Sequence, residues 1–265
     1  MSEGKRYLKL HLIVLVLVVI AELIGTKSYK LGPGTIVLLP MLFALLLGLL
    51  TGPKFLKIVD MEDMKAAENL ITVSVLLLMA KYGTNIGPTL PLIIKSGAAL
   101  ILQEFGNLGT ILLGMPFALL LGLRRESIGA TFSIAREPNI AIISDMYGLD
   151  TPEGRGVMGV YVAGTVFGSI FFGLFAGFAA TVLPFHPYAL AMASGVGSAS
   201  MMSAAVGALV EIFPNMAEEI TALGAASNLA SGADGVYMSI FMALPMCEWI
   251  YRKIIGDRAE EVTKG

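Results

Sequence analysis

The chain has 265 residues, of which 56% are hydrophobic and only 14% are charged. Soluble domains carry about 25% charged residues, so this composition excludes a soluble globular domain and indicates an all-α integral membrane protein. The single cysteine, Cys247, excludes a disulfide framework and a thiolate metal site. His11 and His186 are the only histidines, too few for a histidine-based metal centre. We therefore expect no cofactor, no resident metal and no nucleic-acid partner.

Apolar runs of about 18 residues or more indicate helices that span a bilayer. The first run is too long for a signal-peptide core and no cleavage site follows it, so we interpret it as an uncleaved span. The stretch "GTNIGPTLPLIIKS" contains two prolines and a lysine and is interpreted as a short interfacial segment before one longer span. The alternative is that residues 81–121 form two short helices, split near Glu104–Asn107. The predicted spans are 8–25, 34–51, 67–84, 96–121, 127–148, 156–183, 187–211 and 218–252.

The basic residues predict an orientation, because Lys and Arg favour the cytoplasmic side of a membrane. Eight spans with both termini in the cytoplasm place Arg124 and Arg125 inside and residues 149–155 outside. The count could rise to ten if longer runs divide. One transmembrane domain then covers residues 1–265. It consists of a first part (1–123), a broken-helix part (124–253) and a short cytoplasmic tail (254–265).

The first broken helix is predicted within the span 127–148, where Arg136, Glu137, Pro138 and Asn139 stand in a row. A charged side chain at the bilayer centre costs at least roughly 2.5–3.5 kcal/mol, and proline removes a backbone donor. Such a break is tolerated where it is buried in protein or faces water. We predict a helix that is discontinuous at "REPN", near the midplane. The alternative is a kinked structural helix in which Arg136 and Glu137 pair with each other.

A second discontinuous helix is predicted within 187–211, because Gly195, Gly197, Ser198 and Ser200 lie in the middle of that run. Small residues of this kind also serve as helix-packing surface, which is the alternative. Each of the two segments precedes another long span, so they form a weak internal repeat. The sequence leaves open whether 127–148 and 187–211 cross the membrane or are re-entrant.

Charge balance predicts the coupling chemistry. Glu104, Glu137 and Asp234 give three acids near the midplane against one base, Arg136. Burying that excess in ionised form is prohibitive, so a proton or a cation must neutralise it. Discontinuous helices also offer backbone groups to solutes. The candidate ion-coupling residues are Glu104, Glu137, Asp234 and Asn228. The candidate substrate-binding residues are Arg136, Asn139, Ser133, Gly195, Gly197, Ser198, Ser200 and Asn107.

The stretches "PFALLLGLRRESIGATFSIAREPNIAIISD" and "YALAMASGVGSASMMS" resemble a prokaryotic membrane-protein family known only as a domain of unknown function. More distantly, "ALAMASGVGSASMMS" and "IGATFSIAREPN" resemble the broken segments of the bacterial lysine exporter family. The resemblance implies a secondary transporter in the inner membrane of a prokaryote. It carries over no substrate, because the acidic and aromatic residues of those exporters are not matched here.

The leading hypothesis is therefore a secondary transporter of a small polar metabolite, an amino acid or organic acid, coupled to H⁺ or Na⁺. The proton is slightly favoured, because only the eighth span supplies a compact Asn/Asp/Ser cluster. The alternatives are a channel or pore, or an accessory membrane subunit without transport of its own. An intramembrane enzyme is disfavoured by the absence of a recognisable catalytic motif in the sequence. The expected partners are the lipid bilayer, the substrate and the ion; a homodimer is left open.

Overall fold

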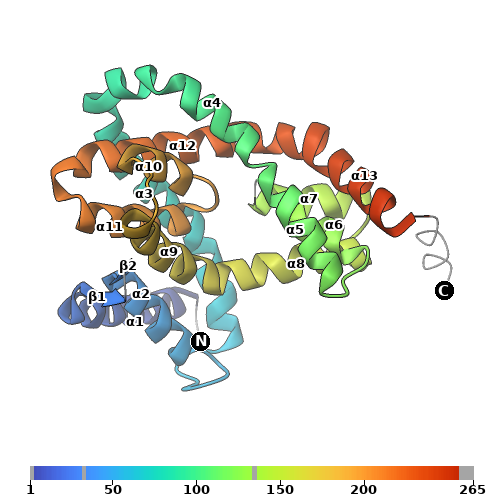
Figure 1. Ribbon diagram of the computed structural model, residues 1–265. Coiled ribbons are helices and arrows are strands. Elements are labelled where there is room, and N and C mark those ends of the chain that lie inside the picture. The colour runs from blue at the N-terminus through green and yellow to red at the C-terminus, as the bar shows by residue number, and fades with distance from the viewer. Residues whose placement is uncertain (1–2, 32–33, 133–135, 257–265) are drawn as a thin grey trace.

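The computed structural model describes residues 3–31, 34–132 and 136–256 (Figure 1). The all-α class is confirmed, with the addition of one small antiparallel sheet. The elements are α1 (Glu3–Ile24), β1 (Lys27–Leu31), β2 (Gly34–Leu38), α2 (Pro40–Thr51), α3 (Met61–Lys95), α4 (Gly97–Gly106), α5 (Gly109–Leu120), α6 (Glu126–Thr131), α7 (Arg136–Met146), α8 (Pro152–Ala163), η1 (Gly164–Gly168), α9 (Ser169–Val182), α10 (Pro187–Ser194), α11 (Ala199–Ile212), η2 (Pro214–Met216), α12 (Ala217–Met238), η3 (Ser239–Ala243) and α13 (Leu244–Ile255).

Two predictions for the first third of the chain are wrong. The run 34–51 is not one helix, because Gly34–Leu38 forms a strand with Lys27–Leu31 and α2 begins only at Pro40. The β-branched residues of that strand favour the extended backbone, and Val37 is fully buried there. Residues 81–95 are not a separate interfacial segment either. They continue α3, which passes through both prolines and ends at Lys95.

The predicted span 96–121 is divided into α4 and α5 by Asn107 and Leu108. Both residues keep helical backbone angles, so the interruption is slight. By length and composition, two helical stretches among the described residues could cross a membrane, Glu3–Ile24 and Gly97–Leu120. The other predicted spans do not meet that criterion; most are interrupted in the structure, whereas 67–84 lies within the continuous helix α3.

The segment 127–148 folds back on itself. Helices α6 and α7 are the two arms of what we call the first helical hairpin, and its two ends meet. The guanidinium of Arg125, just before α6, lies 5.9 Å from the ring centre of Tyr147, just after α7. It also forms an ion pair with Glu153 at the start of α8. The prediction that 149–155 lies on the opposite side from Arg125 is therefore wrong.

The position of the break in this hairpin also differs from the prediction. The motif "REPN" is not the break but the first turn of α7, which begins at Arg136. Proline is tolerated there, because the first turn of a helix has no intrahelical acceptor for its N–H groups. Helix α6 ends at Thr131, so the interruption lies between Thr131 and Arg136.

The second broken segment is also a hairpin. Helices α10 and α11 form the second helical hairpin, and residues 195–198 are its tip. Helix α10 runs in the same direction as α12, since Met192 contacts Ser227 and Gly195 lies against Asn228. Helix α11 joins α12 through residues 213–216 and packs back along it. The two arms therefore run in opposite directions, and the predicted discontinuity at Gly195–Ser198 is confirmed.

Two long helical rods connect the hairpins. The first rod runs from α8 through the π-helical segment η1 to α9, and the second from α12 through the π-helical segment η3 to α13. The first rod starts at the open end of the first hairpin and finishes four residues before α10, at the open end of the second. The second rod returns, because Glu248 of α13 contacts Arg125. The two hairpins thus open at opposite ends of the molecule.

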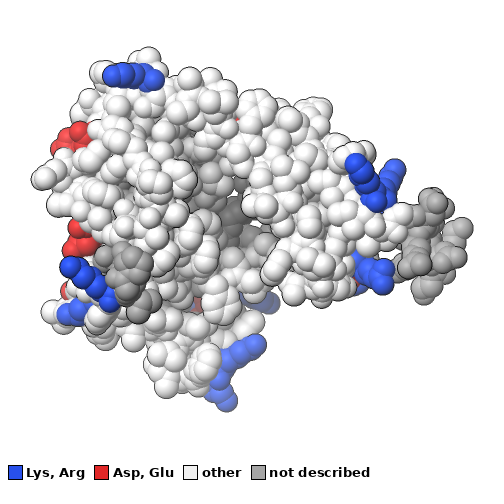
Figure 2. Space-filling view, in the orientation of Figure 1, with Lys and Arg blue, Asp and Glu red and all other residues white. Residues whose placement is uncertain are grey.

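Each hairpin has a separate hydrophobic core (Figure 1). One core surrounds Ile128, Phe132 and Ile143 of the first hairpin and includes the buried face of α13. The other surrounds Met202, Val206 and other residues of the second hairpin and includes Val37 of β2. Figure 2 shows that the face between the two bundles is hollowed, with charged side chains gathered at its margins.

Candidate functional site

A buried polar cluster joins α4 to α12. Glu104 is 7% exposed, and both of its carboxylate oxygens accept hydrogen bonds from Ser231 Oγ, at 2.8 and 3.0 Å. Asn107, at the α4–α5 interruption, donates from Nδ2 to Glu104 Oε2 at 2.8 Å. The interruption places this amide one turn beyond Glu104 on the same face. The cluster was predicted to converge from two distant spans, and it does.

Asp234 belongs to the same cluster. It lies one turn beyond Ser231 on α12, and its carboxyl group is close enough to interact directly with that of Glu104. Its Oδ1 atom is buried and accepts no hydrogen bond from the described residues. Two acids therefore share a small volume whose other polar members, Asn107 and Ser231, are uncharged. The arrangement attracts a proton or a cation.

The tip of the second hairpin is fixed to the helix that carries this cluster. Asn228 of α12 donates from Nδ2 to the carbonyl oxygens of Gly195 and Gly197, both at 2.9 Å. Ser227 Oγ lies 2.7 Å from both Met192 O and Gln103 Oε1, which links α10, α12 and α4. Gly197 has a φ of +110°, a conformation that favours glycine. The carbonyl groups of the turn are thus held on α12 one turn before Ser231, which contacts Glu104.

Close packing at the tip also requires glycine. A Cβ atom added at Gly195 would lie 2.2 Å from Ser227 Oγ and 2.7 Å from the backbone nitrogen of Asn228. The small residues of this segment therefore serve partly as a helix-packing surface, which was the alternative interpretation of the sequence. Ser198 caps α11 by accepting from the backbone N–H of Met201, and Ser198 Oγ lies 3.0 Å from Ser200 Oγ.

The remaining predicted site residues belong to the segment 127–148. Asn139 is fully buried in α7 of the first hairpin. Ser133 lies outside the described residues, and the side chains of Arg136 and Glu137 are likewise outside them. The predicted convergence of Arg136 and Glu137 with the acid pair is therefore untested. The residues that do assemble are Glu104, Asn107, Asn228, Asp234, Gly195 and Gly197.

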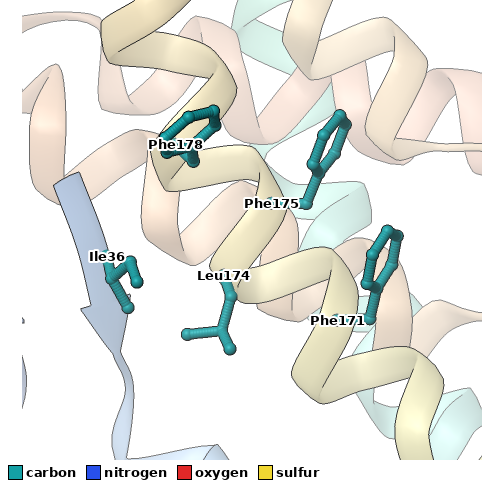
Figure 3. Close-up of a pocket in the computed structure, with 5 residues that line it drawn as sticks. All are labelled: Ile36, Phe171, Leu174, Phe175 and Phe178. Atoms are coloured by element: carbon teal, nitrogen blue, oxygen red, sulfur yellow. The ribbon is translucent and has the colours of Figure 1, made fainter. Parts of the chain in front are cut away.

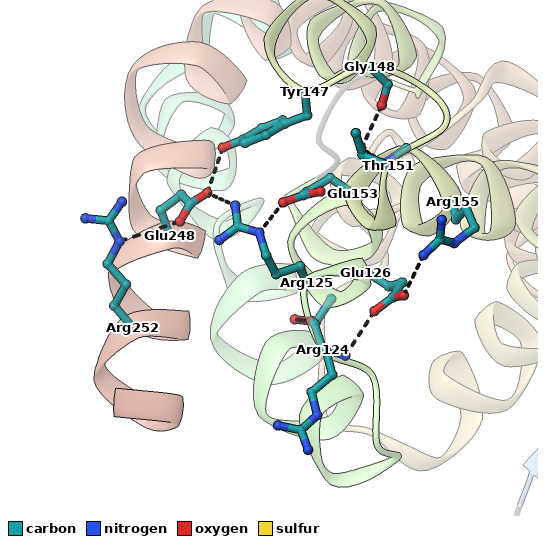
Figure 4. A network of polar contacts seen from close by, with 12 residues as sticks. Arg124, Arg125, Glu126, Tyr147, Gly148, Thr151, Glu153, Arg155, Glu248 and Arg252 are labelled. Atoms are coloured by element: carbon teal, nitrogen blue, oxygen red, sulfur yellow. Dashed lines mark hydrogen bonds and ion pairs between the residues drawn. The ribbon is translucent and has the colours of Figure 1, made fainter. Parts of the chain in front are cut away.

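A second polar network lies at the open end of the first hairpin (Figure 4). Arg125 pairs with Glu153 of α8 and, at 2.9 Å, with Glu248 of α13. Glu248 also accepts a hydrogen bond of 2.8 Å from the hydroxyl of Tyr147. Desolvation lowers the pKa of Arg125, but the hydrogen bond to Glu153 and the charge of Glu248 outweigh it and raise the pKa above its usual value. Arg125 thus remains charged and joins three helices.

Sequence reasoning missed this network because its members lie far apart in the chain. Arg125 and Glu153 were expected on opposite sides of a membrane. The one available signal was that Arg125, Tyr147 and Glu153 bracket the first broken segment. That pattern becomes informative only once the segment is known to fold back.

An apolar pocket lies between β2 and α9 (Figure 3). Its lining side chains are Ile36, Phe171, Leu174, Phe175 and Phe178, and none belongs to either polar group. Phe171 and Phe175 stack with ring centres 5.5 Å apart. Without a convergent polar group, the pocket offers no chemistry for a polar ligand. The described residues also contain no group of three or more His, Cys, Asp or Glu residues that could hold a metal ion.

Comparison with known proteins identifies one family. The family described as "Protein of unknown function (DUF3100)" matches residues 19–253, which is most of the chain. No curated protein and no solved structure matches the chain. The resemblance to a family of unknown function is thereby confirmed, whereas the distant resemblance to lysine exporters gains no support.

Proposed function

The chain belongs to the DUF3100 family, whose description states no function, and we propose that it is a secondary transporter of a small polar metabolite. The observation that carries the proposal is the pair formed by buried Glu104 and partly buried Asp234, on the same helix as Asn228, which holds the tip of the second hairpin. A transporter needs a site whose charge is balanced only when the coupling ion or substrate is bound. An acid pair among uncharged neighbours meets that requirement.

The proposed arrangement in the membrane is six crossings and two re-entrant hairpins. Helices α1, α2 and α3, the pair α4–α5 and the two long rods would cross. The first rod is roughly 45 Å long at 1.5 Å per residue, which exceeds the hydrocarbon core of about 30 Å. The two hairpins would then enter from opposite faces, as in transporters built from inverted repeats.

Charge distribution supports an orientation for this arrangement. Arg124, Arg125, Arg252 and Lys253 lie at the end of the molecule where the first hairpin opens. Glu218 and Glu219 begin α12, at the end where the second hairpin opens. Arg6 and Lys9 of α1 pair with Glu62 and Asp63 of α3, which places the start of α1 beside the start of α3. Since basic residues favour the cytoplasm, we assign both termini and the first hairpin's open end to that side.

The transport step would use the tip of the second hairpin. Its carbonyl groups at Gly195 and Gly197 already face Asn228, and a carbonyl oxygen has a second lone pair for a ligand. The amide Nε2 of Gln103 is buried and donates no hydrogen bond to the described residues, so it is a candidate donor to a substrate carboxylate. An amino acid or organic acid would bind here, with the acid pair occupied by the coupling H⁺ or Na⁺.

The test begins with purified protein and a thermal-shift screen of amino acids and organic acids, because a ligand of the folded state raises the melting temperature. Each hit is then assayed in proteoliposomes under an imposed proton or sodium gradient. We expect saturable uptake by the wild type. Saturable uptake should persist in Glu211→Gln, which alters an exposed acid at the end of α11.

The acid-pair variants distinguish coupling from structure. Glu104→Gln or Asp234→Asn should abolish gradient-driven uptake yet retain exchange of labelled for unlabelled substrate. If both variants keep full gradient-driven uptake, the acid pair is not the coupling device. Flux that does not saturate and needs no gradient would instead indicate a channel. No flux with any hit would favour an accessory subunit.

A further inference from the structure

We propose that Glu104, Asn107, Ser231 and Asp234 form a binding site for a dehydrated Na⁺ ion. The sequence slightly favoured the proton, because only one span was expected to supply a compact set of oxygen ligands. The structure brings α4 against α12 and so adds Glu104 and Asn107 to Ser231 and Asp234. The binding itself does not depend on transport, but its role as the coupling ion rests on the proposed function.

The orientation of the Asn107 amide is the first step. Its Nδ2 donates to Glu104 Oε2 at 2.8 Å and lies 3.5 Å from Ser231 Oγ. The Nδ2 group, not Oδ1, thus faces Glu104 and Ser231, so a cation bound by the carboxylates would be reached by Oδ1 once the side-chain amide turns over and exchanges the two atoms. Asn107 is only 2% exposed, and its Oδ1 has no hydrogen-bond donor among the described residues. A buried acceptor without a donor is destabilising, and a bound cation removes that cost.

The second step concerns another buried acceptor atom that has no hydrogen-bond donor. Asp234 Oδ1 is also buried and also lacks a donor among the described residues. Together with the carboxylate of Glu104 and the hydroxyl of Ser231, the cluster offers hard oxygen atoms from four side chains. Oxygen ligands of this kind bind hard cations, and thiolate or imidazole ligands, which favour transition metals, are absent from these four residues.

The third step concerns the charge of the ion. Asp234 is the charged side chain that acts on Glu104, and the polar neighbours on α4 and α12 — Gln103, Asn107, Asn228 and Ser231 — are uncharged. One monovalent cation and one proton would balance the two carboxylates. Ca²⁺ takes six to eight oxygen ligands, and Mg²⁺ requires octahedral geometry and retains water. Four side chains, three of them buried (Glu104, Asn107 and Ser231), fit a small monovalent ion better.

The experiment uses the full chain in detergent at pH 8. NaCl is titrated against choline chloride at constant ionic strength, and the melting temperature is followed by the fluorescence of Trp249. We expect a saturable rise with Na⁺ and none with K⁺. Asp234→Asn should raise the half-saturating Na⁺ concentration at least tenfold, whereas the control Glu211→Gln should leave it unchanged. Ser231→Ala removes a neutral ligand and should raise it by a smaller factor if Asp234→Asn does not fold.

Four results would overturn the sodium site: no Na⁺-specific rise, an equal rise with K⁺, a larger rise with Ca²⁺, or unchanged Na⁺ dependence in both cluster variants. The proteoliposome assay separates this outcome from failure of the proposed function. Proton-driven uptake without a sodium effect would leave the transporter and reject the sodium site. Sodium binding without flux of any metabolite would leave the site and reject the transporter.

Discussion

The two helical hairpins are built alike but carry their charged groups in different places. In the first, the charges are at the open end, where Arg125 pairs with Glu153 and Glu248. Near the second, the charges lie on α4 and α12, where Glu104 and Asp234 interact among neutral groups on the helix that holds the hairpin's tip through Asn228. A buried charge that is paired ties elements together, and removing one partner is costly. An acid pair for which the described residues show no basic partner is instead arranged to receive a ligand.

This difference distinguishes polar groups that hold helices together from polar groups that are available to bind a ligand. Arg125 contacts elements that must stay together for the first hairpin to remain closed at its base. The acid pair contacts the interrupted part of α4–α5 and the face of α12 that holds the second hairpin's tip. We therefore expect variants in the first network to affect stability and variants in the second to affect ligand binding.

The largest expected effect is on accessibility, which is all or none. In a Cys247→Ala background, a cysteine replaces Leu123, Asp150 or Phe185, all of which are exposed. An impermeant maleimide should label Leu123→Cys and Asp150→Cys from the same side of vesicles and Phe185→Cys from the other. If Asp150→Cys and Phe185→Cys were instead labelled from the same side, the segment 127–148 would cross the membrane fully. The first hairpin would then not be re-entrant, and its comparison with the second would fail.

The next largest effect is on stability. Arg125→Ala leaves Glu153, which is buried, and Glu248 without their central partner, and should cost about 3–5 kcal/mol of unfolding free energy. The matched control is Arg155→Ala, whose side chain is 59% exposed in its pair with Glu126. That loss should stay below about 1 kcal/mol. Equal losses in denaturant titrations of both variants would show that the network is not an anchor.

Much of the second hairpin could be predicted from the sequence. Gly195 and Gly197 interrupt one apolar run, and the polar residues of α12 interrupt another. Hydropathy alone therefore indicates both positions. The alignment of Glu104 with Ser231 could be expected as a convergence of polar groups but not as a geometry, because contacts between distant segments leave no local pattern. The interruption at Asn107 and Leu108 agrees with the alternative in which residues 81–121 split near Glu104–Asn107, but the sequence did not indicate that the Asn107 amide would donate to Glu104.

The first hairpin was less predictable for a physical reason. Two short helices that fold back contain about as many apolar residues as one crossing helix, so hydropathy does not distinguish them. The strand Gly34–Leu38 was missed similarly, because its apolar residues merge with those of α2. In both cases the structure depends on contacts between two segments, Arg125 with Glu153 and β1 with β2. The sequence pattern of each segment alone does not indicate that the two segments pair.

A smaller effect tests how the first hairpin packs on its rod. A Cβ atom added at Gly156 of α8 would lie 2.0 Å from the backbone oxygen of Glu126, whereas one added at Gly159 meets nothing within 4 Å. Gly156→Ala should therefore destabilise by about 1–3 kcal/mol through overpacking. Gly159→Ala should be neutral or stabilising by up to about 1 kcal/mol, since alanine favours the helix. Similar melting temperatures for the two variants would contradict the close contact of α6 with α8.

The smallest effect is a pH dependence at the base of the first hairpin. Hydrogen bonds from its own backbone N–H and from that of Arg124, together with Arg155, hold the pKa of Glu126 below its ordinary value. The lowered pKa stabilises the folded state above the unfolded pKa of about 4.3, and this contribution is lost as pH falls through the folded pKa. Wild type should therefore exceed Glu126→Gln in unfolding free energy by less than about 1 kcal/mol between pH 6 and 7, and the difference should vanish towards pH 3. The exposed control Glu211→Gln reports the background slope. A difference that persists undiminished at pH 3 would mean that Glu126 acts through its size or packing, and the first hairpin's base would then be held by Arg125 alone.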